Sequence, residues 1–379
     1  MAIKLEIDDL EYLLDEIGSF VEGRITPACQ RPEHPISNAI FEQLSQEALE
    51  LGMLPSGSAE TGIALWETST TAESMALNTG MLRLVASRCP GLAFAWHRLA
   101  LANHVIRRVG ADLADNSPLG AILVPVGHYG LGRSSLAKWL SHELIDEDDR
   151  NLLADWLDRD NHMTVMIARE NWESVIWPIW ADGTVGWQWI DRNKMRVDRL
   201  DPQHGFDELR AFRISADIAS GTVYRPDLDT ARVLFRSVLV RDMLGQMAIG
   251  AGALDHGFSL AMEYASLRRQ GGSVIRQHPA VKQLLADIET SLSETGLALR
   301  ALAGEVESID LARIAAARKH VHHALCHAAN QVVQVHGGSG YMRDTGPEKI
   351  LRDINMLRLE TGGLREIDLF LDGLRGAGA

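Results

Sequence analysis

The feature that most constrains the fold of this chain is a long stretch without proline, residues 227–270, along which apolar residues recur at helical spacing. At 1.5 Å per residue, this stretch predicts one helix of roughly 60 Å. Three further stretches with helical periodicity follow, at residues 279–302, 309–335 and 347–359. Long helices with short connections predict an antiparallel four-helix bundle, which we place at residues 225–379.

The N-terminal part also shows helical periodicity. Apolar residues recur at helical spacing from Asp8 to Val21, and a second periodic stretch runs from Ser37 to Gly52, where the glycine is a helix stop signal. The pattern continues over residues 72–108. We therefore predict a helical N-terminal domain at residues 1–120.

The pattern changes in residues 121–224, where short alternating runs such as 163–168, 187–190 and 210–214 are separated by Asp, Asn and Gly. Most of the nine tryptophans of the chain lie in this part, and aromatic side chains suit a half-buried pleated surface. We predict a middle β-barrel-like domain here. The expected fold class is therefore mainly α with a central β domain, between a helical N-terminal domain and a C-terminal four-helix bundle.

The composition limits the partners and the compartment. The chain carries 37 Lys and Arg against 51 Asp and Glu, a formal net charge of −14, which disfavours nucleic acid and anionic membranes as partners. Cys29, Cys89 and Cys326 show no paired spacing, which fits a reducing compartment. The N-terminus lacks the order of a signal peptide, and no apolar run approaches the roughly 20 residues of a membrane span. We expect a cytoplasmic protein without membrane insertion.

Two motifs in the predicted bundle narrow the choice of family. The segment Gln334-Val-His-Gly-Gly-Ser-Gly-Tyr341 is followed by Glu348 and by Arg352-Asp353, and a second motif runs from Tyr264 through Arg268. They resemble the Gln-x-x-Gly-Gly-x-Gly-Tyr and Tyr-Ala-x-x-Arg-x-x-Phe-Gly motifs of the acyl-CoA dehydrogenases. The resemblance extends over nearly the whole chain. It implies a flavoprotein oxidoreductase of fatty acid or other acyl thioester metabolism.

The resemblance also implies FAD as the cofactor, bound by Arg268, Gln270, Gln334, Gly337 and Gly338. The planar fork of arginine suits pyrophosphate oxygens, and a glycine pair at a helix end lets a dinucleotide approach the backbone. In the family, the loop with the glycine pair contacts the adenine half of an FAD that is bound mainly by a neighbouring subunit. The resemblance therefore implies an oligomer, either a homotetramer or a heterotetramer with a homologous subunit.

Several positions depart from the family pattern on the side of the flavin ring. The family has a Thr-Glu-Pro strand whose Thr bonds the ring, whereas this chain reads Ile122-Leu123-Val124-Pro125. Gly271 replaces the aromatic residue of the second motif, and Pro279 replaces a downstream glutamine. We expect flavin binding that is weak, rearranged or dependent on a second polypeptide.

The reaction that the resemblance implies removes the α-proton of an acyl thioester while the β-hydride passes to flavin N5, and it needs a positioned carboxylate. The common base position of the family falls on Thr361, and Glu360 lies one residue earlier. The other base position, counted back from Arg268, holds Asp242. Either Asp242 or Glu360 is therefore the candidate base, and the remaining alternative is that the chain has no functional base. The thioester would be one of coenzyme A or of an acyl carrier protein, and the sequence does not define the electron acceptor.

Two alternative functions stay open. The lost ring contacts also fit a half-site subunit of a heterotetramer, which lends Gly337 and Gly338 to a flavin in a partner chain. The same fold also serves flavin oxidases and monooxygenases. We expect no metal site, because no metalloprotease motif accompanies His323 and His327, although their spacing on a helix can seat zinc.

Overall fold

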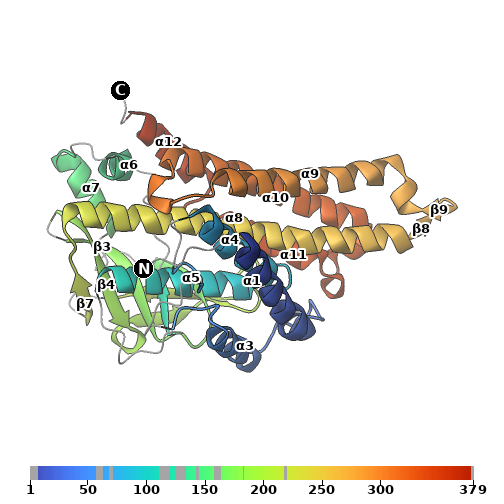
Figure 1. The fold of residues 1–379 in the computed structure, drawn as a ribbon, viewed down its shortest axis with the longest axis horizontal. Coiled ribbons are helices and arrows are strands. Elements are labelled where there is room, and N and C mark those ends of the chain that lie inside the picture. Colours follow the sequence, from blue (N-terminus) through green and yellow to red (C-terminus); the bar gives the residue numbers. More distant parts are fainter. Residues whose placement is uncertain are drawn as a thin grey trace.

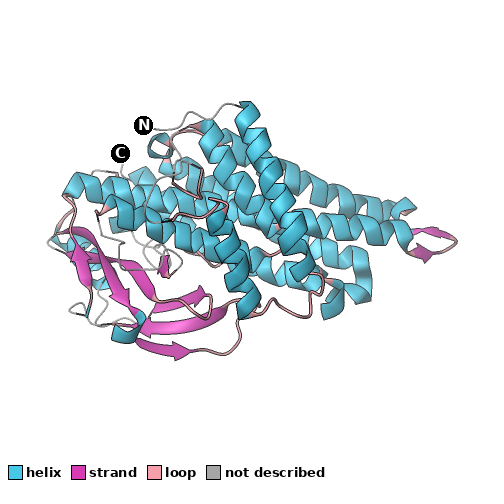
Figure 2. Ribbon diagram, turned by 60° about the horizontal axis from the view of Figure 1, so that its bottom comes forward, coloured by secondary structure: helices cyan, strands magenta, loops and turns pink. Residues whose placement is uncertain are grey.

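The computed structural model describes residues 7–56, 63–67, 71–110, 120–123, 134–141, 145–157, 164–181, 183–216 and 220–376. In chain order it contains a helical part, a part with two small β-sheets, and a bundle of long helices (Figure 1). The two sheets lie at one end of the molecule, and the bundle extends from them to the opposite end (Figure 2). This confirms the predicted fold class. None of the helices in these residues is long and apolar enough to cross a membrane.

The N-terminal part is helical, as predicted. Its elements are α1 (Ile7–Phe20), the π-helix η1 (Val21–Ile25), α2 (Thr26–Ala28), α3 (Asn38–Glu50), α4 (Ala72–Ala86) and α5 (Pro90–Arg108). Ser37 caps α3 by accepting a hydrogen bond from the amide of Ile40, and Thr71 forms a capping box with Ser74 before α4. Helix α5 is buried along nearly its whole length, because helices and a strand cover it on several sides.

The middle part contains two sheets, with strand orders β1-β3-β4-β7 and β2-β6-β5. The strands are β1 (Ala121–Leu123), β2 (Thr164–Ala168), β3 (Ser174–Ala181), β4 (Thr184–Asp191), β5 (Arg196–Arg199), β6 (Arg210–Ser215) and β7 (Thr222–Tyr224). Strand β1 runs parallel to β3, and the other pairs are antiparallel. Trp172, Trp177 and Phe212 lie in a core to which both sheets contribute.

Two helices also lie in this part, α6 (Ser134–Leu140) and α7 (Glu147–Leu157), which the alternating pattern did not predict. The sequence carried a signal for α7, since the acidic residues of its first turn, Glu147, Asp148 and Asp149, favour a helix N-terminus.

The C-terminal part is built on α8 (Leu228–Leu267), a helix of 40 residues whose first turn is capped by Asp227. The other helices are α9 (Pro279–Ala301), α10 (Leu311–His336), α11 (Pro347–Leu357) and α12 (Leu364–Gly376). A hairpin of β8 (Arg269–Gln270) and β9 (Ser273–Val274) links α8 to α9, and the 3-10 helix η6 (Gly337–Tyr341) follows α10. The predicted bundle is therefore present, with α12 as a further helix that packs on α6 and α10.

Glycines allow α8 to lie close to the N-terminal helices. A side chain at Gly245 would clash with the ring of His97 on α5, and one at Gly252 would clash with the backbone of Arg83 on α4. At both positions, the absence of a side chain lets the helices pack closely. The approach at Gly245 also brings the polar residues of α5 and α8 into contact.

Candidate active site

Asp242 lies on the face of α8 that packs against α5, and its side chain is fully buried. One carboxylate oxygen, Oδ1, lies 3.0 Å from His97 Nε2 and accepts a hydrogen bond of 3.0 Å from Gln246 Nε2. The other oxygen, Oδ2, accepts hydrogen bonds from Arg98 at 3.1 Å and from the hydroxyl of Thr361. Asp242 is therefore the centre of a buried polar network.

Glu360 belongs to the same network. Arg98 donates through Nη1 to Asp242 and through Nη2 to Glu360 Oε2, at 2.7 Å. Arg318 donates to Gln246 Oε1 at 2.6 Å and to the carbonyl of Glu360 at 3.2 Å. The structure therefore brings together the two candidate bases, and a single guanidinium joins them.

The backbone at Thr361 has an unusual conformation. Its φ is 56°, in the left-handed region, which a β-branched residue rarely adopts. The hydroxyl of Thr361 donates to Asp242, so the strained backbone is held by a buried polar contact. Trp66 also has a positive φ, 62°, and its indole Nε1 donates to His97 Nδ1 at 2.8 Å. Backbone strain of this kind concentrates at functional sites, which is consistent with a site here.

The surroundings of Asp242 favour its charged form. Burial by itself would raise the pKa of Asp242, but the charge of Arg98 and the hydrogen bonds from His97 and Thr361 hold that pKa well below its usual range. Burial lowers the pKa of His97, although Asp242 opposes this effect. Because Trp66 donates to Nδ1 of a neutral His97, the ring proton lies on Nε2 and points to Asp242.

Sequence reasoning missed several members of this network. His97, Arg98, Gln246 and Arg318 were not among the candidate residues, although each of these side chains is buried. A signal for two of them was present, because His97 and Arg98 interrupt a helix that is otherwise largely apolar and buried. Polar groups in such a position need partners, and here Asp242 is that partner.

The predicted cofactor residues lie elsewhere. Arg268, Gln270, Gln334, Gly337 and Gly338 are all exposed, at the end of the bundle where α8 and α10 terminate. The rings of Tyr264 and His336 stack at 4.5 Å and join these two helix ends.

The glycine pair offers an open stretch of backbone. Gly337 ends α10 with a φ of 58°, and no atom lies within 4 Å of where a side chain would start at Gly337 or Gly338. Exposed backbone without side chains fits the adenine half of a dinucleotide that approaches from another molecule.

The residues for the flavin ring fit less well. Strand β1 holds Ile122 and Leu123 in the predicted ring-binding stretch, and both are buried apolar residues without a hydroxyl. Val124 and Pro125 lie outside the described residues. Strand β1 pairs with β3 at the sheet end of the molecule, whereas the hairpin β8–β9 lies at the opposite end (Figure 1). The two groups of residues therefore lie at opposite ends of the same chain.

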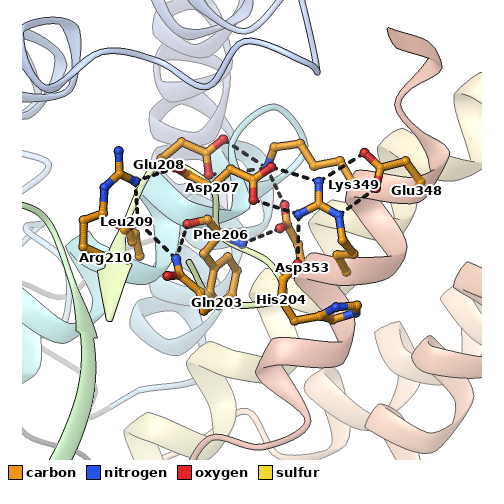
Figure 3. A network of polar contacts seen from close by, with 11 residues as sticks. Gln203, His204, Phe206, Asp207, Glu208, Leu209, Arg210, Glu348, Lys349 and Asp353 are labelled. Atoms are coloured by element: carbon orange, nitrogen blue, oxygen red, sulfur yellow. Dashed lines mark hydrogen bonds and ion pairs between the residues drawn. The ribbon is translucent and has the colours of Figure 1, made fainter. Parts of the chain in front are cut away.

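A second polar network explains part of the C-terminal motif (Figure 3). Asp353 accepts a hydrogen bond of 2.6 Å from the amide of Phe206, another residue with positive φ. Lys349 bridges Asp353 and Glu208, at 2.6 Å and 3.0 Å. Arg352 makes two hydrogen bonds with Asp207, at 2.7 Å and 2.8 Å. The Arg-Asp pair therefore fastens α11 to the middle part.

Comparisons with known proteins agree with this architecture. Residues 235–369 match the family model of the acyl-CoA dehydrogenase C-terminal domain. The 3-sulfinopropanoyl-CoA desulfinase of Paraburkholderia xenovorans is 30% identical over 125 residues, which are 33% of this chain and 32% of that protein. The chain thus matches about a third of the length of this curated relative.

Solved structures match over the full length. Butyryl-CoA dehydrogenase from Megasphaera elsdenii has a TM-score of 0.69 at 13% identity, covering 100% of this chain and 99% of that one. A structure of PigA with FAD and proline has a TM-score of 0.72 at 14% identity, covering 99% of this chain and 100% of the other. At these identities, the likeness shows the fold. Residues 235–369 are thus similar to the C-terminal domain of the acyl-CoA dehydrogenases, and the chain as a whole shares the fold of these solved structures.

Proposed function

We propose that the protein catalyses the FAD-dependent α,β-dehydrogenation of an acyl thioester, with Glu360 as the base that takes the α-proton. The observation that carries this proposal is the meeting of Asp242 and Glu360 at Arg98. Removal of a weakly acidic α-proton needs a carboxylate that is positioned in a site with little water. The network around Arg98 is buried and supplies two carboxylates.

Glu360 is the better candidate for the base. Asp242 is fully buried and is contacted by four side chains, and its low pKa makes it a poor proton acceptor. The side chain of Glu360 is 11% exposed, so it is less completely buried than that of Asp242. Asp242 then serves as a positioning residue, because it holds Arg98, which in turn orients Oε2 of Glu360.

The reaction balances as the loss of a proton from the α-carbon, which Glu360 accepts, and of a hydride from the β-carbon. FAD, when bound, would supply the hydride acceptor. Arg268, Gln270, Gln334, Gly337 and Gly338 would hold its adenine half, and the likeness to a structure of PigA that contains FAD supports this cofactor. Because these residues lie at the far end of the bundle from the sheets, the site would be completed by another subunit, as in a homotetramer or heterotetramer.

The substrate of this proposal is a thioester of coenzyme A or of an acyl carrier protein. The matched curated relative is named for an acyl-CoA substrate, which favours coenzyme A. In this proposal, the reacting carbons bind beside the Arg98–Glu360 pair.

A second candidate function is that of a half-site subunit. It is favoured by the apolar, hydroxyl-free strand β1, which gives the flavin ring no side-chain donor from Ile122 or Leu123. The test is the flavin content of the protein, purified alone and after co-expression with a homologous subunit. One FAD per chain in the protein alone supports the first function. Flavin that appears only in a heteromeric complex supports the second.

A further inference from the structure

A cavity of about 210 Å³ lies beside the C-terminal half of α5. At about 30 Å³ per molecule in the liquid, this volume holds about seven waters. Its polar wall includes Glu67, Asn103, His104, Arg107 and Arg108. The candidate bases are not among its lining residues, so it is distinct from the network around Arg98.

The charges in this wall are predominantly positive. Among the lining residues that the structure describes, Glu67 is the one acidic side chain, and it lies 2.8 Å from Arg107, which balances its charge. Arg108 lies at the surface, with 57% of its side chain exposed, and its contact with Glu307 is a long one of 3.9 Å. Such an exposed pair at long distance gives weak stabilisation, so the guanidinium of Arg108 is available to a ligand.

A buried cation lies behind the cavity. His104 Nε2 is 2.8 Å from the hydroxyl of Ser237, and Arg241 donates to the same hydroxyl at 2.5 Å. Arg241 is 3% exposed, and no carboxylate in the described parts of the chain lies within 4 Å of it. Its Nε also has no hydrogen-bond partner among the described residues. Glu307 favours the charge of Arg241 from beyond that distance. A buried charge without a counter-ion in direct contact is costly, and a bound anion would reduce that cost.

Both basic groups are affected by this environment. Burial lowers the pKa of Arg241 to about 9. Burial, together with the charges of Arg241 and Arg108, also lowers the pKa of His104 well below its usual value. His104 is therefore neutral, and its ring can donate one hydrogen bond without carrying a charge of its own.

We propose that this cavity binds a compact oxyanion of the phosphate class. Arg108 would contact the anion from the mouth of the cavity and His104 from its wall, while the charge of Arg241 would act through Ser237. Arginine forks match phosphate oxygens in geometry and charge, and the cavity has room for such a group. The anion site itself does not depend on the flavin reaction, whereas its assignment to a thiol carrier rests on the proposed function. The phosphate group would belong either to the free ion or to a phosphate ester of a thiol carrier.

The test is isothermal titration of the intact protein, in phosphate-free buffer, with three probes: inorganic phosphate, 4′-phosphopantetheine and adenosine 3′,5′-bisphosphate. We expect saturable binding of at least one probe. Arg108→Gln should weaken it by about tenfold or more, as loss of a charged hydrogen bond does. The matched control is Arg269→Gln, which removes the same charge from an exposed site on β8 and should leave the affinity unchanged.

The pattern of binding identifies the source of the anion. Tighter binding of one ester than of inorganic phosphate assigns the site to a carrier, and equal or tighter binding of the inorganic ion assigns it to the free anion. The Arg241→Lys variant keeps the buried charge, so it should bind the probes more tightly than the Arg241→Gln variant. The absence of saturable binding by all three probes, or equal affinities of Arg108→Gln and Arg269→Gln, would overturn the proposal.

Discussion

Asp242 and Glu360 share the guanidinium of Arg98, which lies 3.1 Å from the first carboxylate and 2.7 Å from the second. Arg318 lies against the same network and donates to the carbonyl of Glu360. Two carboxylates and two guanidinium groups therefore share one buried site. Because the charges balance, the free-energy cost of burying them is reduced. Removal of one charged group leaves a group of opposite charge buried without its partner.

Arg98→Met is expected to lower the free energy of unfolding by about 3–5 kcal/mol, because it leaves Asp242 and Glu360 without their shared cation. Urea denaturation followed by circular dichroism measures this loss. The control is Lys194→Met, which breaks the exposed pair of Lys194 and Asp191 and should change the stability little. Similar losses for the two variants would contradict a structural role for Arg98.

Thr361→Val should cost about 1–3 kcal/mol, because it keeps the shape of the side chain but removes the hydroxyl that donates to buried Asp242. Thr361→Ser keeps the hydroxyl and should retain most of the stability. The two midpoints of urea denaturation give the comparison. A valine variant with the same midpoint of urea denaturation as the wild type would show that the contact with Asp242 does not contribute to stability.

Gly245→Ala should destabilise the protein by about 1–3 kcal/mol, since the new methyl group would clash with the His97 ring and displace it from Asp242. Gly18→Ala is the matched control, because Gly18 also lies within a helix, α1, and open space surrounds it. Thermal denaturation of the two variants tests this difference. We further expect Gly338→Ala to lower the flavin content, because the methyl group would keep the dinucleotide from the backbone.

The network in Figure 3 should make stability depend on pH. Burial raises the pKa of Asp353 to about 6, with Glu208 adding to the effect and Lys349 opposing it. The folded state then binds more protons than the unfolded state between the ordinary pKa of about 4 and this raised value. The contribution of Asp353 to stability should therefore be full below about pH 4 and should fall as the pH rises to about 6.

Denaturation midpoints of the wild type and of Asp353→Asn, measured across this range, test the sign. The stability of the wild type relative to the variant should decline as the pH rises, and then level off. Asp344→Asn, which changes an exposed acid near α11, is the control and should show no such decline. A relative stability that increases from pH 4 to pH 6 would contradict the assignment.

Features that depend on local pattern were predictable. The length of α8 followed from its proline-free periodicity, and the positions of Asp242 and Glu360 from their distance to family motifs. Their meeting at Arg98 was not predictable, since it requires α5 to pack against α8 across a long sequence separation. For the same reason, Arg352 and Asp353 were recognised as a motif, whereas their partners Asp207 and Phe206 were not.

The most direct test of the proposed function is the anaerobic bleaching of bound flavin by a panel of acyl-CoA thioesters, in the complex that contains FAD. We expect the wild type to bleach with at least one thioester. Glu360→Gln should retain its flavin but bleach at least about 100-fold more slowly, as expected for loss of a general base. Bleaching of the Glu360→Gln variant at the wild-type rate, or no bleaching of a flavin-loaded wild type by any thioester, would contradict the account.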